Sequence, residues 1–143
     1  SLRGLLSSLL FACLVRPGLP AEAGYSSNFA WRHDAQPVAM RSRSGKVLWS
    51  TPYPQERNDI PMIMGRQLDA KDFAQMIIDN FDEMLDQARH QPLVMGIALH
   101  PYIIGQPYRL RHLRRALQHI AAARDQGQIW MTTPGAIFDH VKG

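Results

Sequence analysis

The chain has 143 residues, of which 45% are hydrophobic and 20% charged, and it is long enough to bury one hydrophobic core in a single expected domain. Its 16 Lys and Arg against 12 Asp and Glu give a net charge of +4, which is too mild to favour a nucleic-acid partner. The single cysteine, Cys13, excludes an internal disulfide and a cysteine-rich zinc site. The six histidines are scattered, so we expect no metal site and no cofactor. No run reaches about 18 apolar residues, so no membrane-spanning helix is expected.

Residues 1–20 form an apolar segment with two interpretations. Arg3, an apolar stretch over 5–15 and then Ala21-Glu22-Ala23 follow the order of a secretory signal, which predicts an exported protein. The leucines of the same stretch also stand at helical spacing, which favours an ordinary helix of a cytoplasmic protein. Gly24 then predicts a helix end that passes into a strand.

Short strands and polar loops alternate after this segment. We expect strands over 25–31 and 46–50, with a polar turn over 41–45 between them. The next segment contains three closely spaced prolines, Pro52, Pro54 and Pro61. They predict an ordered, non-helical loop, and a loop of this length is often functional.

The clearest predicted helix begins at Asp69 as its N-cap and ends near His90. Five carboxylates between Asp72 and Asp86 fall largely on the side away from the apolar residues, which predicts a solvated face rather than an acid–base site. The expected apolar stripe consists of Phe73, Met76, Ile77, Phe81, Met84, Leu85 and Ala88.

The apolar run Leu93–Leu99 is typical of a strand buried on both faces in a parallel sheet. His100 and Pro101 follow directly, and ligands of parallel α/β sheets and barrels bind beyond the carboxyl ends of the strands. His100 is therefore a candidate for chemistry. The alternative is a loop histidine that makes one structural hydrogen bond.

A second helix is expected after a loop over 102–107, with an apolar stripe of Leu110, Leu113, Leu117, Ile120 and Ala121. Four arginines crowd its first two turns, where the helix dipole disfavours cations: Arg109, Arg111, Arg114 and Arg115. They either serve an anionic ligand or form a solvated face that pairs with the acidic helix before it. A strand over 129–134 and a short helix over 136–141 end the chain.

Together these elements predict an α/β fold of repeated β/α units with a parallel sheet and flanking helices. Such a fold gathers the polar strand ends at one edge of the sheet. No Gly-rich phosphate loop, nucleophile elbow or CxxC is present, which disfavours nucleotide binding and covalent Ser or Cys catalysis. The residues expected to converge are 31–34, 55–59, His100, Thr132 and Thr133.

Several motifs resemble the polysaccharide deacetylase (NodB-homology) family, in its allantoinase-like and imidase-like branch. The resemblance covers residues 21–143 and corresponds to the carboxyl-terminal portion of that family, whereas residues 1–20 remain unmatched. The motifs are Gly96-Ile97-Ala98-Leu99-His100-Pro101, Gly105-Gln106-Pro107, Arg109-Leu110 and Ile129-Trp130-Met131-Thr132-Thr133-Pro134-Gly135.

The resemblance implies part of an irregular (β/α)7 barrel, with the later strands only, that hydrolyses carbon–nitrogen bonds of cyclic amides or N-acetylated sugars. It implies that His100 protonates the leaving nitrogen, and that Trp31, Asn58 and Asp59 shape the substrate pocket. The early zinc-ligand motifs of the family are absent, so no metal is expected in this chain. Ala30 and Ala35 replace acidic residues that are common in this branch.

A complete barrel of this kind needs roughly 250 residues. We therefore expect a carboxyl-terminal fragment that is inactive by itself, and whether a second copy or another chain completes the barrel stays open. The alternative from another class is a small basic binding module without catalysis, in which the face over 109–115 meets an anionic partner with strong salt dependence.

Overall fold

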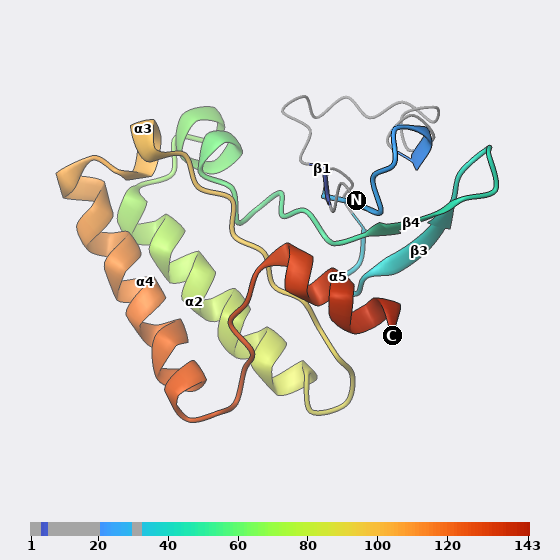
Figure 1. Ribbon diagram of the computed structural model, residues 1–143. Coiled ribbons are helices and arrows are strands. Elements are labelled where there is room, and N and C mark those ends of the chain that lie inside the picture. The colour runs from blue at the N-terminus through green and yellow to red at the C-terminus, as the bar shows by residue number, and fades with distance from the viewer. Residues whose placement is uncertain (1–3, 6–20, 30–32) are drawn as a thin grey trace. The chain divides into compact units, whose positions relative to one another are not determined.

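Figure 1 presents a computed structural model of the chain, and the structure describes residues 4–5, 21–29 and 33–143. The expected single domain divides into two compact units. The sheet unit comprises residues 1–53 and 132–143, and the helical unit comprises residues 54–131.

The sheet unit holds every strand of the described residues. These are β1 (Gly4–Leu5), β2 (Ser27–Asn28), β3 (Val38–Arg41) and β4 (Val47–Ser50), in the order β1-β2-β4-β3. β2 pairs in parallel with both β1 and β4, whereas β3 pairs antiparallel with β4. β2 and β4 confirm the two strands expected over 25–31 and 46–50. The rest of the apolar segment before Ala21 lies outside the described residues.

The hairpin of β3 and β4 makes the sheet mixed, so the prediction of a wholly parallel sheet is wrong. The polar turn between the two strands is confirmed, because Ser42 N donates to Lys46 O at 2.9 Å and Gly45 adopts a φ of 80°. β3 was not expected, because Val38 to Arg41 show no apolar alternation. This strand leaves Val38 exposed and depends on its ladder with β4.

The last helix, α5 (Pro134–Lys142), belongs to the sheet unit and confirms the short helix expected over 136–141. Thr133 is its N-cap, and the Thr133 hydroxyl accepts a hydrogen bond from Ala136 N at 3.3 Å. Pro134 occupies the first turn, where a missing backbone N–H costs no helical hydrogen bond. Phe138 supplies its buried side chain.

The helical unit contains four helices. They are the π-helix η1 (Ile60–Gly65), α2 (Ala70–Gln87), the short α3 (Pro101–Ile104) and α4 (Pro107–Asp125). α2 and α4 confirm the two main predicted helices. Two loop predictions are wrong. η1 forms where a non-helical loop was expected through Pro61, and α3 forms within the loop expected over 102–107. Each of these short helices carries its proline in the first turn, where proline fits.

The core of the helical unit lies between α2 and α4, which run side by side in the same direction (Figure 1). Asp69 stands at the N-cap position of α2, although its side chain makes no capping hydrogen bond in the described structure. The acidic face of α2 is exposed, as expected, whereas the predicted stripe residue Ala88 is exposed rather than buried. The buried core side chains are Met62, Ile63, Phe73, Ala74, Ile77, Phe81, Ile103, Ile104, Leu113, Ala116, Ile120 and Ala123.

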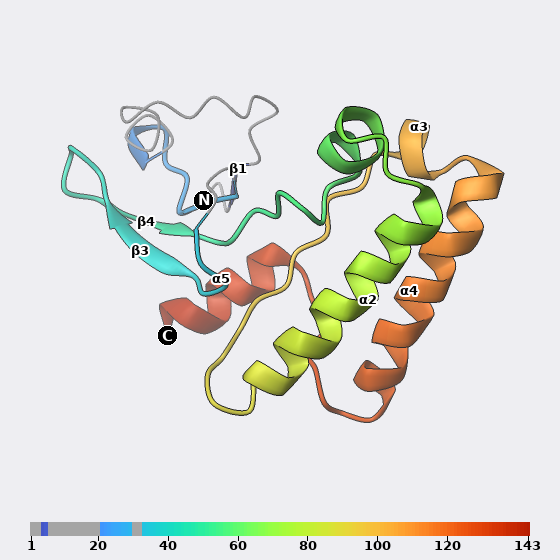
Figure 2. The same cartoon turned by 180° about the vertical axis from the view of Figure 1, so that it is seen from behind.

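The segment Leu93–Leu99 differs from its prediction as a strand buried on both faces. It runs back along α2 in extended form (Figure 2), all of its residues are only partly buried, and Ala98 alone forms a bridge, to Asn58. Met95, Ile97 and Leu99 pack against the helical core, so the side chains alternate as in a strand. Residues 129–133 likewise form no strand. A strand needs a neighbouring backbone to which it can hydrogen-bond. Among the described residues, the bridge between Asn58 and Ala98 is the only one that Leu93–Leu99 forms.

None of the helices in the described ranges combines the length and apolarity that a bilayer crossing requires.

The buried ring of Phe73 predicts where the helical unit is most sensitive to mutation. Phe73 is 0% exposed in the core between α2 and α4. Replacement by alanine removes an aromatic ring and leaves a cavity, so Phe73→Ala is expected to lower the free energy of unfolding by about 3–5 kcal/mol. Urea unfolding followed by circular dichroism measures this loss.

The matched control is Met64→Ala, because Met64 is 59% exposed on η1. That change is expected to stay within about 0.5 kcal/mol. Equal effects of the two substitutions would contradict the placement of the core.

Candidate active site around His100 and Asp59

The candidate site begins with a short parallel backbone pairing in the helical unit. Ala98 N donates to Arg57 O at 2.9 Å, and Asp59 N donates to Ala98 O at 3.3 Å. This pattern is the parallel bridge between Asn58 and Ala98. The register brings the segment that ends at Asp59 alongside the segment that ends at His100.

The Asp59 carboxylate binds His100 through both of its oxygens. Oδ1 lies 2.7 Å from the ring Nδ1 of His100, and Oδ2 accepts the backbone N–H of His100 at 2.8 Å. Asp59 is 0% exposed, while the His100 side chain keeps 31% of its surface exposed. The buried Asp59 carboxylate therefore fixes the partly exposed imidazole of His100.

This geometry determines which ring nitrogen of His100 can act on a ligand. A carboxylate is a hydrogen-bond acceptor only, so Nδ1 must carry the hydrogen that lies between it and Oδ1. In the neutral ring Nε2 then holds the lone pair. Among the described residues Nε2 has no hydrogen-bond partner, so it is the ring atom that can exchange a proton with a bound molecule.

Two short helices hold the pair in place. Asp59 is the N-cap residue of η1, and His100 is the N-cap residue of α3. Each helix buries two side chains in the core of the helical unit, Met62 and Ile63 from η1 and Ile103 and Ile104 from α3. The Asp59–His100 contact therefore joins two anchored elements.

Arg57 supports this pairing and lies in the range 55–59 that was expected to converge, although no individual role was predicted for it. Its Nε donates to Gly96 O at 3.0 Å, and another guanidinium nitrogen donates to Asn80 Oδ1 on α2 at 2.6 Å. Burial lowers the pKa of the Arg57 guanidinium from its usual value, and the nearby charge of Glu56 opposes that shift. Arg57 thus connects the extended segment before His100 to α2. A lone arginine in a polar loop gives no sequence signal for this role.

Asn58 lies in the site as a buried residue, with 2% of its surface exposed. Its side-chain Oδ1 accepts a hydrogen bond from Ile60 N at 3.0 Å and so stabilises the start of η1. Its predicted contact with a substrate stays a prediction. The same holds for Trp31, which lies outside the described residues.

Of the residues expected to converge, the structure brings together four in the helical unit, and they are Arg57, Asn58, Asp59 and His100. His33 and Thr133 are part of the sheet unit. The His33 ring bonds through Nε2 to the buried Ser50 hydroxyl at 2.8 Å, and its Nδ1 lies 3.0 Å from Asp34 O. Because Ser50 is 0% exposed, this pair closes a loop onto β4 rather than presenting a nucleophile.

The arginines at the start of α4 have mixed surroundings. Arg109 is half-buried, donates to Ile103 O at 3.1 Å and lies over the ring of Tyr108. Arg115 donates to Lys71 O at 3.4 Å on α2. The carboxylate of α2 that contacts α4 is Asp82, which bonds to His119 at 2.6 Å.

Within residues 4–5, 21–29 and 33–143, no three His, Cys, Asp or Glu side chains come together as metal ligands.

Comparison with known proteins finds likeness in structure. No protein-family model and no curated protein matches the sequence. The solved structure of Puue allantoinase matches with a TM-score of 0.76 and 26% identity, over 85% of this chain and 40% of that one. A chain assigned as a polysaccharide deacetylase from Pseudomonas aeruginosa PAO1 matches with a TM-score of 0.72 and 25% identity, over 85% and 40%. A second chain assigned as a polysaccharide deacetylase, from Mycobacterium smegmatis, matches with a TM-score of 0.82 and 18% identity, over 97% of this chain and 49% of that one.

These matches confirm the predicted resemblance to polysaccharide deacetylases and allantoinase as a structural match to part of those proteins. The third likeness, at 18% identity, bears on the fold alone. The chain spans 40–49% of the length of the solved chains that it matches.

The two bonds from His100 to Asp59 predict the effect of Asp59→Asn on the ring. An amide has one acceptor oxygen and one donor NH2 group, so it cannot accept from both the backbone N–H and Nδ1–H of His100. The amide oxygen is expected to keep the backbone N–H, and the NH2 group to donate to Nδ1. The ring hydrogen of neutral His100 then moves to Nε2, which ¹⁵N NMR of the imidazole detects.

His119 serves as the internal control, because it also bonds to a carboxylate but lies on the exposed surface of α4. Its tautomer is expected to be the same in both proteins. A His100 ring that kept its hydrogen on Nδ1 in Asp59→Asn would contradict the assigned contact.

Proposed function

We propose that this chain carries the proton-donating part of a hydrolase that cleaves carbon–nitrogen bonds other than peptide bonds, within a polysaccharide-deacetylase-like barrel of which it forms the carboxyl-terminal portion. The observation that carries the proposal is the buried Asp59 carboxylate behind His100, which leaves Nε2 as the reactive ring atom. The substrate is a small cyclic amide or an N-acetylated sugar.

The reaction places His100 at the collapse of the tetrahedral intermediate. Water adds to the amide carbonyl, and the carbon then carries the attacking oxygen, the former carbonyl oxygen and the leaving nitrogen. The imidazolium form of His100 transfers its Nε2 proton to that nitrogen as the carbon–nitrogen bond breaks. The proton that water loses on addition goes to the group that activates water. An N-acetylated sugar then gives acetic acid and an amine, whereas a cyclic amide opens to one molecule that carries both the carboxylic acid and the released nitrogen. The His100 ring returns to its neutral form with the hydrogen on Nδ1.

Asp59 is a positioning residue in this proposal rather than the base that activates water. Both of its oxygens bind His100, and its side chain is fully buried. It fixes the orientation and tautomer of the ring, as carboxylates do for catalytic histidines elsewhere. The group that activates water is assigned to residues outside this chain, so the chain is proposed to be inactive by itself.

Two comparisons support this proposal beyond the fold. Puue allantoinase, and the Pseudomonas aeruginosa protein assigned as a polysaccharide deacetylase, reach 26% and 25% identity with this chain. The first name specifies an enzyme of allantoin, and the second an enzyme that removes acyl groups from a polysaccharide. Hydrolysis of a carbon–nitrogen bond, within the ring of allantoin or in an acetamido group attached to a sugar ring, is the chemistry that this proposal takes from both names.

The activity of the chain itself tests the proposal. We expect the 143-residue chain to hydrolyse neither allantoin nor N-acetylglucosamine above the rate in buffer. Ring opening of allantoin and acetate release from the sugar measure these reactions. Turnover would contradict the proposed inactivity of the isolated chain.

The role of His100 is then tested on any turnover that is found. General acid catalysis contributes typically 10²- to 10⁴-fold, so His100→Gln is expected to reduce the rate at least about 100-fold. His119→Gln, which alters the other carboxylate-bonded histidine of the helical unit, is expected to leave the rate unchanged. A rate that survives in His100→Gln refutes the proton-donor role.

A further inference from the structure

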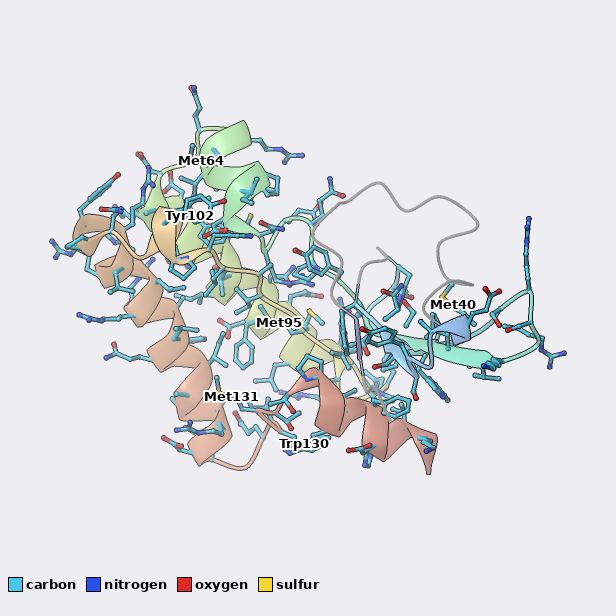
Figure 3. The ribbon with its side chains drawn as sticks, turned by 45° about the horizontal axis from the view of Figure 1, so that its top comes forward. Met40, Met64, Met95, Tyr102, Trp130 and Met131 are labelled. Carbon is cyan, nitrogen blue, oxygen red and sulfur yellow. The ribbon has the colours of Figure 1, made fainter. Side chains whose placement is uncertain are left out.

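Tyr102 is an aromatic residue beside the reactive histidine that no part of the proposed chemistry has used. Its ring centroid lies 5.7 Å from that of His100, with an angle of 67° between the two ring planes. Tyr102 is 68% exposed, which is unusual for a large aromatic side chain in contact with a buried site. Figure 3 labels it on α3 of the helical unit.

The turn that carries Tyr102 is held in a fixed position. Ile103 and Ile104 are 2% and 3% exposed in the core, and the Arg109 guanidinium donates to Ile103 O at 3.1 Å. Gly105 ends α3, and a Cβ atom at that position would lie 2.2 Å from Pro101 O. A tight turn that requires glycine and a buried pair of isoleucines therefore present the Tyr102 ring outward.

The neighbouring helix η1 adds apolar surface at the same place. Ile60 directly follows Asp59 and is 38% exposed, and Met64 is 59% exposed. η1 and α3 lie side by side in Figures 1, 2 and 3. The exposed residues of η1 and α3, the helices that follow Asp59 and His100, therefore combine one aromatic ring with aliphatic and thioether groups.

We propose that Tyr102 is a specificity-determining residue that packs against a ring that bears or contains the scissile amide. This inference rests on the proposed function, because it places the substrate at Nε2 of His100. A nitrogen that accepts a proton from Nε2 lies about 3 Å from that atom. The two side-chain ring centroids lie 5.7 Å apart, and the proposal places the atoms bonded to that nitrogen between Nε2 and the Tyr102 ring.

A flat ring face is the group that this surface is suited to bind. Aromatic side chains interact best with the faces or edges of other rings. The C–H face of a pyranose and the planar face of a hydantoin ring both meet this requirement, whereas an acyclic amide presents neither. Tyr102 thus favours ring-bearing amides over acyclic ones.

The experiment titrates the 143-residue chain with N-acetylglucosamine, allantoin and glucose and follows the ring signals of Tyr102 and His100 by NMR. Glucose has the pyranose face without the amide. We expect all three probes to shift the Tyr102 ring protons, and the two amides alone to shift Nε2 of His100. Allantoin and the sugars separate the hydantoin face from the pyranose face as the source of binding.

Substitutions then test the packing directly. Tyr102→Ala is expected to raise the dissociation constants of the ring-bearing amides about three- to tenfold, and Tyr102→Phe to change them less than twofold. Tyr108→Ala is the matched control, because Tyr108 is also an exposed tyrosine of the helical unit, at 63% exposure. It is expected to leave the constants unchanged.

The outcomes separate this inference from the proposed function. Probes that shift His100 while Tyr102→Ala binds them as tightly as the native chain overturn the role of Tyr102 and leave His100 as the proton donor. Probes that shift Tyr102 but never Nε2 of His100 support ring packing and overturn the proposed chemistry. Probes that shift neither residue overturn both.

Discussion

The helical unit depends on one buried anion and on the two donors that satisfy it. An isolated carboxylate away from water is strongly destabilising, so Asp59 requires partners that remain in place. His100 provides both, through its backbone N–H and its ring. Because the backbone N–H cannot move without moving the chain, the carboxylate fixes the position of the residue as well as the orientation of its side chain. The site is therefore part of the folding of this unit rather than an addition to its surface.

The same contact divides the chemical work among the residues. Asp59 is committed to His100 and is shielded from solvent, Asn58 stabilises the start of η1, and Arg57 connects the extended segment to α2. Three consecutive polar residues that look alike as candidates in the sequence thus have three separate structural partners. The imidazole of His100 is 31% exposed and keeps Nε2 out of its contact with Asp59, so the proposed chemistry rests on that nitrogen.

Local patterns predicted the two long helices of the helical unit. The 3.6-residue spacing of Phe73, Ile77 and Phe81 identified α2 because a helix buries one face wherever it packs. The short helices η1 and α3 were missed because a proline reads as a break, although a first-turn proline fits a helix. The contact between Asp59 and His100 joins positions 41 residues apart, and no periodicity reports on a separation of that size. The family resemblance named both residues, but as a pocket residue and an acid rather than as a bonded pair.

The segment Leu93–Leu99 explains how a strand prediction can fail while the site it positions still forms. Side-chain alternation follows from packing on one surface, and the helical core supplies that surface to Met95, Ile97 and Leu99. A hydrogen-bonded ladder needs a neighbouring backbone, and among the described residues this segment is bridged at Ala98 alone. That one bridge is also the pairing that sets Asp59 beside His100. Regular sheet structure along the other residues of the segment would add stability to the fold, but the geometry of the imidazole needs only the register that Ala98 provides.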